Sequence, residues 1–272
     1  MLFRSPQRKV KKRLSPTRLI VRADYQDLCR DVTKQLVSSA RKAIDQRGVF
    51  NLALAGGSTP RGVYGALSHP EYCPQIDWTK THLFWGDERW VPAGHGLHNA
   101  TSAFEKGFLN VPIPRAHIHP IPTGTSRPSQ SAARYKKILA RHLRSPRSRY
   151  PVFDVILLGL GADGHVASLF PGDDALYEKR DWVRAVTLPG VRPPRITVTF
   201  PVINSARAVW VLVSGKEKQA VLKQFLSGKK DGKILPIERI RPTRGIFSVY
   251  ADRKAAGGFR SGKFFPGARS AR

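Results

Sequence analysis

Near the middle of the chain stands the stretch Phe153-Asp-Val-Ile-Leu-Leu-Gly-Leu-Gly-Ala-Asp-Gly-His165, a short apolar run followed by a glycine-rich turn and a histidine. An apolar run that is bounded by turn residues is typical of a strand buried on both faces of a sheet. In open α/β sheets, ligands bind beyond the carboxyl ends of the strands. The stretch therefore predicts a central strand at 153–158 and a site where that strand ends.

Strand-like runs lie on both sides of this stretch, and helical patterns separate most of them. In the segment 25–47, apolar residues from Leu28 to Ile44 recur every four positions, and Gly48 ends the predicted helix. The other expected strands are 49–55, 81–85, 196–200, 208–213 and 246–250; the other expected helices include 99–109, 129–144 and 216–227, and 110–128 is expected to be an irregular loop. This alternation predicts a single α/β domain with a mostly parallel sheet and helices on both faces.

The positive charge is concentrated at the two ends of the chain. The formal net charge of the 272 residues is +28, residues 1–23 carry eight Lys or Arg and no acid, and residues 253–272 carry six and no acid. We therefore expect a basic disordered arm at 1–22, an α/β domain at 23–252 and a basic disordered tail at 253–272. An organelle-targeting peptide is the alternative interpretation of residues 1–16.

Composition excludes several classes of protein. The apolar runs are too short to span a bilayer, no apolar segment of a secretory signal follows the basic start, and Cys29 and Cys73 are too few for a disulfide framework or a cysteine metal cluster. A cytoplasmic setting is the expectation. Nucleic-acid binding remains an alternative because of the charge, but the sequence lacks a basic-aromatic RNA signature, and an anionic small substrate suits a basic protein equally well.

A phosphate cradle is predicted at Leu52-Ala-Leu-Ala-Gly-Gly-Ser-Thr-Pro60. A strand that runs into two glycines, two hydroxyls and a helix start brings backbone N–H groups and the positive end of a helix dipole to one point. Gly57, Ser58 and Thr59 are therefore candidate phosphate ligands. The alternative is a plain glycine turn with Ser58 or Thr59 as helix cap and Pro60 in the first helical turn.

Two basic residues add to this prediction. Arg195 opens a strand, and Lys218 lies in the first turn of a predicted helix, where a cation opposes the helix dipole unless an anion is nearby. A phosphate clamp is the functional interpretation of the pair. A solvated helix start, with Glu217 offsetting the charge of Lys218, is the alternative.

The turn after 153–158 contains the pattern Gly-x-Gly-x-x-Gly, which also occurs in dinucleotide sites. The context argues against a dinucleotide, because His165 follows the third glycine and Pro171-Gly172 soon break any helix. His165 is instead a candidate general base, since an unperturbed imidazole titrates near neutrality, at about 6.5, and Asp163 can orient it.

Taken together, these segments resemble the 6-phosphogluconolactonase family. The resemblance runs from about Ala23 to Asp252 and depends on Leu-Ala-Leu-Ala-Gly-Gly-Ser-Thr-Pro, Gly-Asp-Glu-Arg-Trp-Val-Pro and, above all, Gly-Leu-Gly-Ala-Asp-Gly-His-Val-Ala-Ser-Leu-Phe-Pro-Gly. It implies a Rossmann-like sheet, hydrolysis of 6-phospho-D-glucono-1,5-lactone in the pentose phosphate pathway, a small sugar-phosphate lactone as partner, and no cofactor or metal. A monomer is favoured over an oligomer.

The resemblance also implies roles for particular residues. His165, beside Asp163, becomes the base that takes a proton from the attacking water. The residues expected to face the substrate or its phosphate are Gly57, Ser58, Thr59, Asp87, Arg89, Arg195 and Lys218.

Two rivals and two departures accompany this interpretation. The related aminosugar-phosphate deaminases carry a Glu shortly after the histidine, whereas 166–170 contains no carboxylate here. A basic nucleic-acid-binding protein on an enzyme-derived fold is the rival from another class. The family pattern also leads us to expect Ser before Asn99 and Gly at 244, where this chain has His98 and Arg244.

Overall fold

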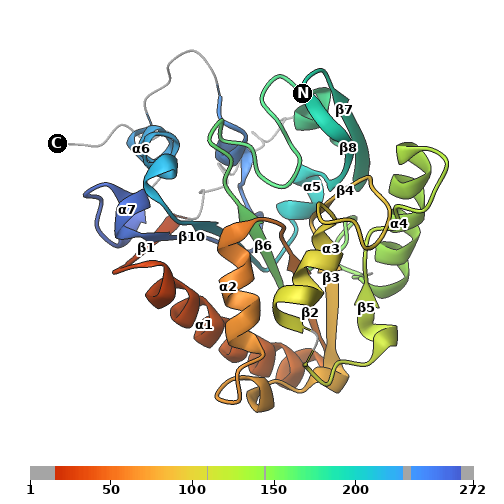
Figure 1. Ribbon diagram of the computed structural model, residues 1–272, viewed down its shortest axis with the longest axis horizontal. Coiled ribbons are helices and arrows are strands. Elements are labelled where there is room, and N and C mark those ends of the chain that lie inside the picture. Colours follow the sequence, from red (N-terminus) through yellow and green to blue (C-terminus); the bar gives the residue numbers. More distant parts are fainter. Residues whose placement is uncertain (1–15, 109, 144, 229–233, 265–272) are drawn as a thin grey trace, which may run out of the picture.

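A computed structural model describes residues 16–108, 110–143, 145–228 and 234–264 (Figure 1). The strands are β1 (Thr17–Arg22), β2 (Phe50–Leu54), β3 (Thr81–Trp85), β4 (Asp87–Arg89), β5 (Ile118–His119), β6 (Val155–Gly159), β7 (Val183–Leu188), β8 (Val191–Val198), β9 (Ala208–Val213), β10 (Ile246–Asp252) and β11 (Gly262–Phe264). Eight of them form one sheet in the order β11-β1-β10-β9-β6-β2-β3-β5. Its neighbouring strands run parallel except for the β1/β11 pair at one edge. The expected mostly parallel sheet is confirmed.

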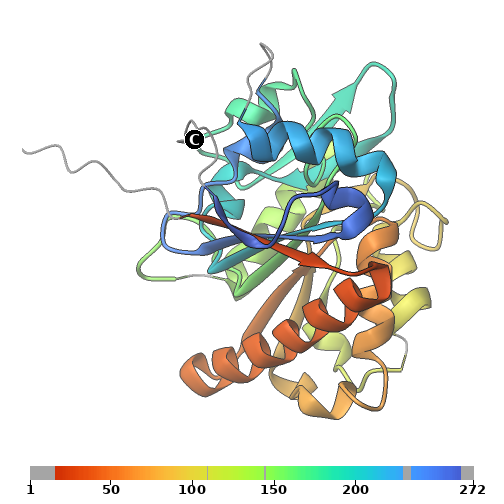
Figure 2. The ribbon, with the colours of Figure 1, turned by 90° about the vertical axis from the view of Figure 1, so that its left-hand side faces the viewer.

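Helices cover both faces of this sheet, as predicted. The helices are α1 (Tyr25–Arg47), α2 (Ser58–Leu67), α3 (Asn99–Ala103), α4 (Pro128–His142), α5 (Phe200–Ile203), α6 (Gln219–Ser227) and α7 (Arg253–Ala256). Figure 2 shows α1 on one side of the sheet and α6 on the other. Within the described residues, no helix combines the length and the apolar character needed to cross a membrane.

The longest helix begins and ends where the sequence predicted. The Asp24 side chain accepts a hydrogen bond from the backbone N–H of Asp27 at 2.8 Å, which caps the start of α1. Gly48 stops the helix in the left-handed conformation, with φ of 73°. The buried face of α1 contains the predicted positions Leu28, Val32 and Leu36, which are fully buried.

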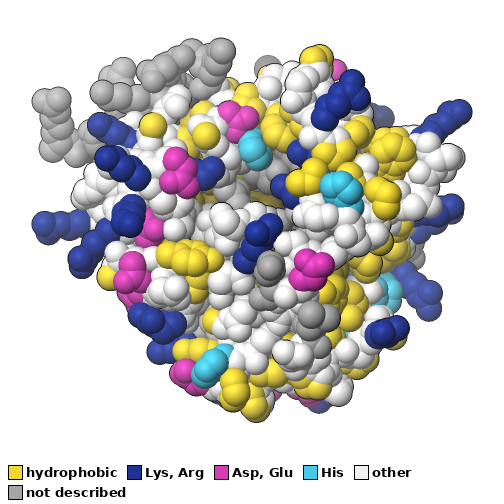
Figure 3. Space-filling model, viewed as in Figure 1, with side chains coloured by type: hydrophobic (Ala, Val, Ile, Leu, Met, Phe, Trp, Pro, Cys, Tyr) yellow, Lys and Arg dark blue, Asp and Glu magenta, His cyan; other side chains and the backbone are white. Residues whose placement is uncertain are grey.

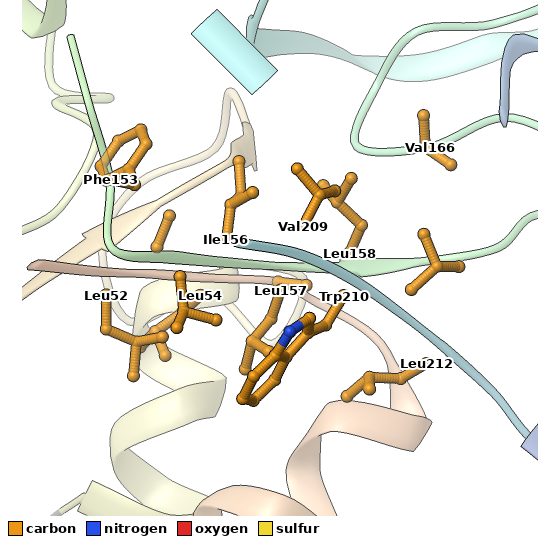
Figure 4. Packing of buried hydrophobic residues seen from close by; sticks show 14 of the residues in the cluster. Leu52, Leu54, Phe153, Ile156, Leu157, Leu158, Val166, Val209, Trp210 and Leu212 are labelled. Atoms are coloured by element: carbon orange, nitrogen blue, oxygen red, sulfur yellow. The ribbon is translucent and has the colours of Figure 1, made fainter. Parts of the chain in front are cut away.

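The core lies on both faces of the central strands. In Figure 4, Ile156 and Leu158 of β6 point to one face, whereas Leu157 points to the other, together with Trp210 and Leu212 of β9. All five are buried. Because both faces are covered by other elements, the central strands are apolar throughout instead of alternating with polar residues.

A second sheet of three antiparallel strands, in the order β4-β8-β7, stands beside the first. The strand expected at 196–200 is part of β8 and belongs to this second sheet, not to the parallel one. Gly86 connects the two sheets: its N–H donates to the carbonyl of Leu54 at 2.9 Å, and its carbonyl accepts from the N–H of Val198 at 2.9 Å. In Figure 1 the small sheet lies against α4.

The expected boundaries of the domain were wrong at both ends. β1 begins at Thr17 and lies between β10 and β11, so residues 17–22 belong to the sheet, and α7 and β11 carry regular structure on to Phe264. The pattern was missed because β1 contains Arg18 and Arg22, and because its partners come from the far end of the chain. Residues 1–15 and 265–272 of the expected arm and tail lie outside the described residues.

The contact between α1 and α2 depends on a glycine and supplies a test of the packing. A methyl group at Gly62 would collide with the Tyr25 hydroxyl and with Cys29 Sγ. We expect Gly62→Ala to lower the free energy of unfolding by about 1–3 kcal/mol, since overpacking forces neighbouring atoms to move. Denaturant unfolding measures this.

Gly65→Ala is the matched control, because Gly65 is exposed in the same helix. It should leave stability unchanged or raise it by roughly 0.5–1 kcal/mol, as helix propensity predicts. Equal effects of the two substitutions would contradict the close packing at Gly62.

Candidate active site

The turn that follows β6 holds a histidine and an aspartate in contact. His165 Nδ1 lies 2.6 Å from Asp163 Oδ1, and the backbone N–H of His165 donates to the same oxygen at 3.1 Å. The N–H of Gly161 donates to the carbonyl of His165 at 2.9 Å, which closes the turn. A Cβ at Gly161 would overlap both the imidazole and the carboxylate, so the pair can fold back only over a glycine. With Nδ1 bonded to Asp163, Nε2 is the ring nitrogen left for other chemistry.

His165 lines a cleft of about 210 Å³ at the carboxyl ends of β2, β6 and β9. Figure 3, drawn from the same side as Figure 1, shows a hollow in the upper half of the molecule that is bordered by basic, acidic and histidine side chains. Seven of the nine predicted site residues line the cleft: Gly57, Ser58, Thr59, Asp87, Arg89, His165 and Lys218. The two that do not are Asp163, which bonds His165, and Arg195, which pairs with Arg89 across β8 and β4.

The start of α2 forms one wall of the cleft. Its N-cap is Gly57, with φ of 101°, and no side chain caps the helix, so the alternative interpretation, a cap by Ser58 or Thr59, is wrong. Pro60 does lie in the first turn, as expected. The Tyr25 hydroxyl contacts the carbonyls of Ser58 and Thr59 at 3.0 and 3.2 Å and fixes this turn. An uncapped helix start presents N–H groups and a positive dipole end, which favour an anion.

Asp87 is buried, and hydrogen bonds fix both its side chain and its backbone carbonyl. Its Oδ2 accepts from the Ser168 hydroxyl at 2.6 Å, and its backbone carbonyl accepts from Asn99 Nδ2 at 2.9 Å. Asn99 in turn requires the absence of a side chain at Gly56, where a Cβ would overlap its amide. Ala167, beside Ser168, has φ of 50°, an uncommon conformation for a residue with a side chain. The cleft is thus bordered by a constrained turn on each side.

Glu88 has a structural role that the sequence did not reveal. It is fully buried, and its carboxylate accepts from the N–H groups of Arg89, Asn99 and Ala100 at 2.8, 2.6 and 2.9 Å. Burial raises the pKa of Glu88 to about 7, against the opposing effect of these hydrogen bonds. The carboxylate caps the start of α3 and anchors it to β4.

His98, the first departure from the family pattern, takes part in the same cap. It is the N-cap of α3, and its Nδ1 accepts from the N–H of Thr101 at 3.2 Å. Burial, and secondarily the nearby His95, lower the pKa of His98. The ring is therefore neutral at pH 7, where its Nε2 lies 3.5 Å from Glu88 Oε2. A serine hydroxyl at position 98 could accept the same hydrogen bond from the helix start, so His98 replaces the expected Ser without loss of the helix cap.

Arg195 and Arg89 form a pair of neighbouring cations next to the cleft. Burial first, and then the charge of Arg89, lower the pKa of Arg195, while Asp87 and Glu88 act in the opposite direction. Each guanidinium donates to a backbone carbonyl: Arg195 to Pro193 at 2.7 Å and Arg89 to Leu97 at 3.0 Å. Two half-buried cations side by side are stabilised by an anion.

A larger hollow of about 1030 Å³ lies elsewhere, and Arg244, the second departure, lines it together with Arg241. None of the predicted site residues lines this hollow, so the Arg244 departure does not alter the cleft that holds His165.

Sequence reasoning missed several residues that position the site, namely Gly56, Asn99, Gly161 and Ser168. Gly56, Gly161 and Ser168 stand inside the quoted motifs. Gly161 packs against the histidine and aspartate of its own motif, whereas the partners of Gly56 and Ser168 lie elsewhere in the chain. The motifs mark the segments in which these residues stand, but they do not show which side chains the residues contact.

A histidine–aspartate pair beside an anion cradle, at the carboxyl ends of parallel strands, is an arrangement that suits an enzyme acting on a phosphorylated small molecule. Residues 23–249 match the family model described as glucosamine-6-phosphate isomerases/6-phosphogluconolactonase. The chain belongs to this family.

Individual relatives agree with this assignment. The chain is 41% identical over 201 residues to a 6-phosphogluconolactonase of Synechocystis sp., covering 74% of this chain and 81% of the relative. It is 36% identical to a probable chloroplastic 6-phosphogluconolactonase 4 of Oryza sativa subsp. indica, covering 85% and 73%. The solved 6-phosphogluconolactonase of Trypanosoma brucei is 31% identical with a TM-score of 0.78, covering 90% of this chain and 99% of that one.

The pKa of Glu88 generates a prediction about stability and pH. Because the folded-state pKa, about 7, exceeds the ordinary value of 4.5, the folded protein binds more protons than the unfolded chain between these values. The free energy of unfolding should therefore fall as pH rises from about 4.5 to about 7, by up to about 3 kcal/mol relative to Glu88→Gln. Denaturant unfolding of both proteins across this range measures the difference.

Other titrating groups are common to both proteins and cancel in the comparison. A difference between wild type and Glu88→Gln that stays constant from pH 4.5 to 7 would contradict the raised pKa.

Proposed function

We propose that this chain hydrolyses 6-phospho-D-glucono-1,5-lactone to 6-phospho-D-gluconate, the second step of the oxidative pentose phosphate pathway. The observation that carries the proposal is the His165–Asp163 pair, 2.6 Å apart, on a cleft that also holds the uncapped start of α2 and Lys218. A base and an anion cradle in one small cleft suit a phosphorylated ester that reacts with water.

The reaction begins with attack of water on the lactone carbonyl. His165 Nε2 takes a proton from the water as the new C–O bond forms, and Asp163 holds the ring in the tautomer whose Nε2 accepts it. The tetrahedral intermediate then collapses, the bond between the carbonyl carbon and the ring oxygen breaks, and the imidazolium returns the proton to that oxygen. The neutral imidazole is thereby regenerated, and the product carboxylic acid loses its own proton to water.

The phosphate end of the substrate fits the basic part of the same cleft. The N–H groups of Ser58 and Thr59 at the start of α2, the Lys218 ammonium and the Arg89 guanidinium line that part of the cleft, and Arg195 adds charge behind Arg89. Charge-assisted contacts to phosphate are strong and directional. They hold the ring in place relative to His165, so that the reaction gains from orientation.

The contacts after His165 argue against the deaminase rival. Val166 and Leu169 are buried, and Ser168 is bonded to Asp87. No carboxylate of 166–170 stands ready for the additional proton transfers that ring opening and isomerisation require. The nucleic-acid rival predicts a steep dependence of binding on salt concentration, since each phosphate contact releases counterions.

The cytoplasm is the proposed setting. A reducing compartment agrees with the two free cysteines. The name of the Oryza sativa relative gives a chloroplast location for that protein, so a plastid is the competing setting for this one.

Substitution of His165 tests the catalytic proposal. His165→Asn retains hydrogen bonding but cannot accept the proton, so kcat should fall by about 10²–10⁴-fold, the usual contribution of general-base assistance. Product binding should persist, because the phosphate contacts are unchanged. Lactone hydrolysis, corrected for the spontaneous rate, gives kcat, and calorimetry gives product affinity.

His69→Asn is the control, since His69 is exposed and does not line the cleft. It should keep wild-type kcat. A folded His165→Asn protein with more than a tenth of wild-type kcat would exclude His165 as the base.

Lys218 and Lys216 offer a matched test of phosphate recognition within one short helical turn. Lys218 is half-buried and lines the cleft, whereas Lys216 is exposed and does not. Lys218→Ala should lower kcat/KM by roughly 10–100-fold on the phosphorylated lactone and much less on the unphosphorylated one. Lys216→Ala removes the same charge and should change neither value appreciably.

Arg195→Ala should give a loss of similar size to Lys218→Ala and with the same preference for the phosphorylated lactone. Equal losses on both lactones would mean that these cations act on folding or on the reacting carbonyl.

A further inference from the structure

Four of the eight histidines of the chain gather at one edge of the main sheet, away from the cleft. His82 lies near the start of β3, His119 ends β5, and His142 ends α4, with His117 in the turn just before β5. Figure 1 shows β3, β5 and α4 together at this edge. These positions are far apart in the sequence, and no motif connects them.

The ring nitrogens of His82, His119 and His142 converge on one point. One nitrogen of each ring lies within 4.8 Å of those of the other two, and His82 Nδ1 is 2.9 Å from His119 Nε2. Zn–N bonds of about 2.0–2.1 Å place tetrahedral ligand atoms about 3.3 Å apart. The three nitrogens are therefore near the separation of a metal-binding set and need only small side-chain adjustments to reach it.

The surroundings keep these rings neutral. Burial, followed by the neighbouring His117 and His142, lowers the pKa of His82 to about 4. Burial, followed by His142 and His82, lowers the pKa of His119 to about 3.

A fourth ring lies against the cluster. His117 stacks on His82 with ring centroids 4.0 Å apart, and its buried Nδ1 has no hydrogen-bond partner in the described part of the chain. On the other side, Phe84 stacks on His119 at 4.6 Å. Packing alone would be served equally by apolar rings, which do not carry the cost of burying unsatisfied nitrogens.

We infer that His82, His119 and His142 form a binding site for a divalent transition-metal ion, Zn²⁺ being the simplest occupant, with water completing the coordination. The three nitrogen ligands suit Zn²⁺, Ni²⁺ or Cu²⁺ and are a poor set for Mg²⁺ or Ca²⁺, which prefer oxygen ligands. This departs from the expectation of no metal, which considered cysteines and local motifs and not histidines brought together by the fold.

The position of the site indicates what a bound ion does. β3 has His82 near its first residue, and its last residue, Trp85, is followed closely by Asp87 of the cleft. The three histidines lie at the β3/β5 edge of the sheet, and none of them lines the cleft, so the metal site and the cleft are separate. An ion at this edge joins the end of α4 to β3 and to the two-residue strand β5, and so stabilises the fold without entering the reaction.

The test uses the full chain without an affinity tag, stripped of metal with a chelator and dialysed. Titration with Zn²⁺ by calorimetry should give one equivalent bound, and Tm should rise with the Zn²⁺ concentration because the ion binds the folded state. Co²⁺ should give the absorption of a nitrogen-ligated tetrahedral ion. Lactone hydrolysis should stay within twofold of the metal-free value.

His142→Ala is the informative variant, because His142 is only partly buried at the end of a helix and its loss should be tolerated. It should weaken Zn²⁺ binding at least tenfold and remove the rise in Tm. His69→Ala, the control, removes an exposed histidine and should bind as wild type does.

Unchanged Zn²⁺ affinity in His142→Ala, or fewer than a tenth of an equivalent bound by the wild type with no rise in Tm, would overturn the inference. If His142→Ala fails to fold, His82→Gln provides the same comparison, since the amide keeps a hydrogen-bonding group beside His119.

Discussion

Two adjacent buried carboxylates, Asp87 and Glu88, hold the rest of the site together. A buried carboxylate is costly unless its oxygens accept hydrogen bonds, so each of these side chains fixes the position of its donors. Glu88 accepts hydrogen bonds from the backbone at the start of α3, and Asp87 accepts one from Ser168 in the turn beyond β6. The strand that contains both residues belongs to the antiparallel sheet, and Gly86, just before it, connects that sheet to the parallel one. Three separate segments are thereby joined where the main sheet ends.

The cleft follows from where glycine is required. At Gly56 the missing side chain admits the Asn99 amide, and at Gly161 it admits the histidine and its aspartate partner. Both glycines stand just past a parallel strand, the place where such sheets leave room for a ligand. The glycines of the motifs are therefore understandable as steric requirements: the space at Gly56 is filled by Asn99 from another segment, and the space at Gly161 by His165 and Asp163 of the same turn.

Local signals in the sequence were sufficient for the regular elements. The four-residue recurrence from Leu28 to Ile44 fixed α1 to the residue at both ends, and the runs at β3 and β9 were equally well placed. Elements without a local signal were missed: β1 has arginines within it, and β5 is two residues long. The small sheet was missed because the sequence of β8 shows a strand but not its partners.

The same distinction applies to the site. The loops around Gly57 and His165 were recognised from consecutive residues, and the fold brought them together as expected. The helix cap was wrong because Ser58 and Thr59 lie inside the helix, with Gly57 at its border. Glu88 gave no signal, since a carboxylate among charged neighbours is indistinguishable in sequence from a surface residue. The histidine cluster was invisible for a related reason: its members come from three elements.

The position of β1 has a consequence for biosynthesis. Among the strands of the described residues, β1 is made first, yet both of its neighbours, β10 and β11, are made last. At roughly 5–20 residues per second, β1 waits on the order of ten to fifty seconds before it can pair. During that interval Leu19-Ile20-Val21 is an apolar strand with two open edges, the kind of segment that aggregates. Arg18 and Arg22 flank it directly, and flanking charges oppose such aggregation. Two of the basic residues near the amino end thus stand at the positions where flanking charges oppose aggregation of a strand that pairs late.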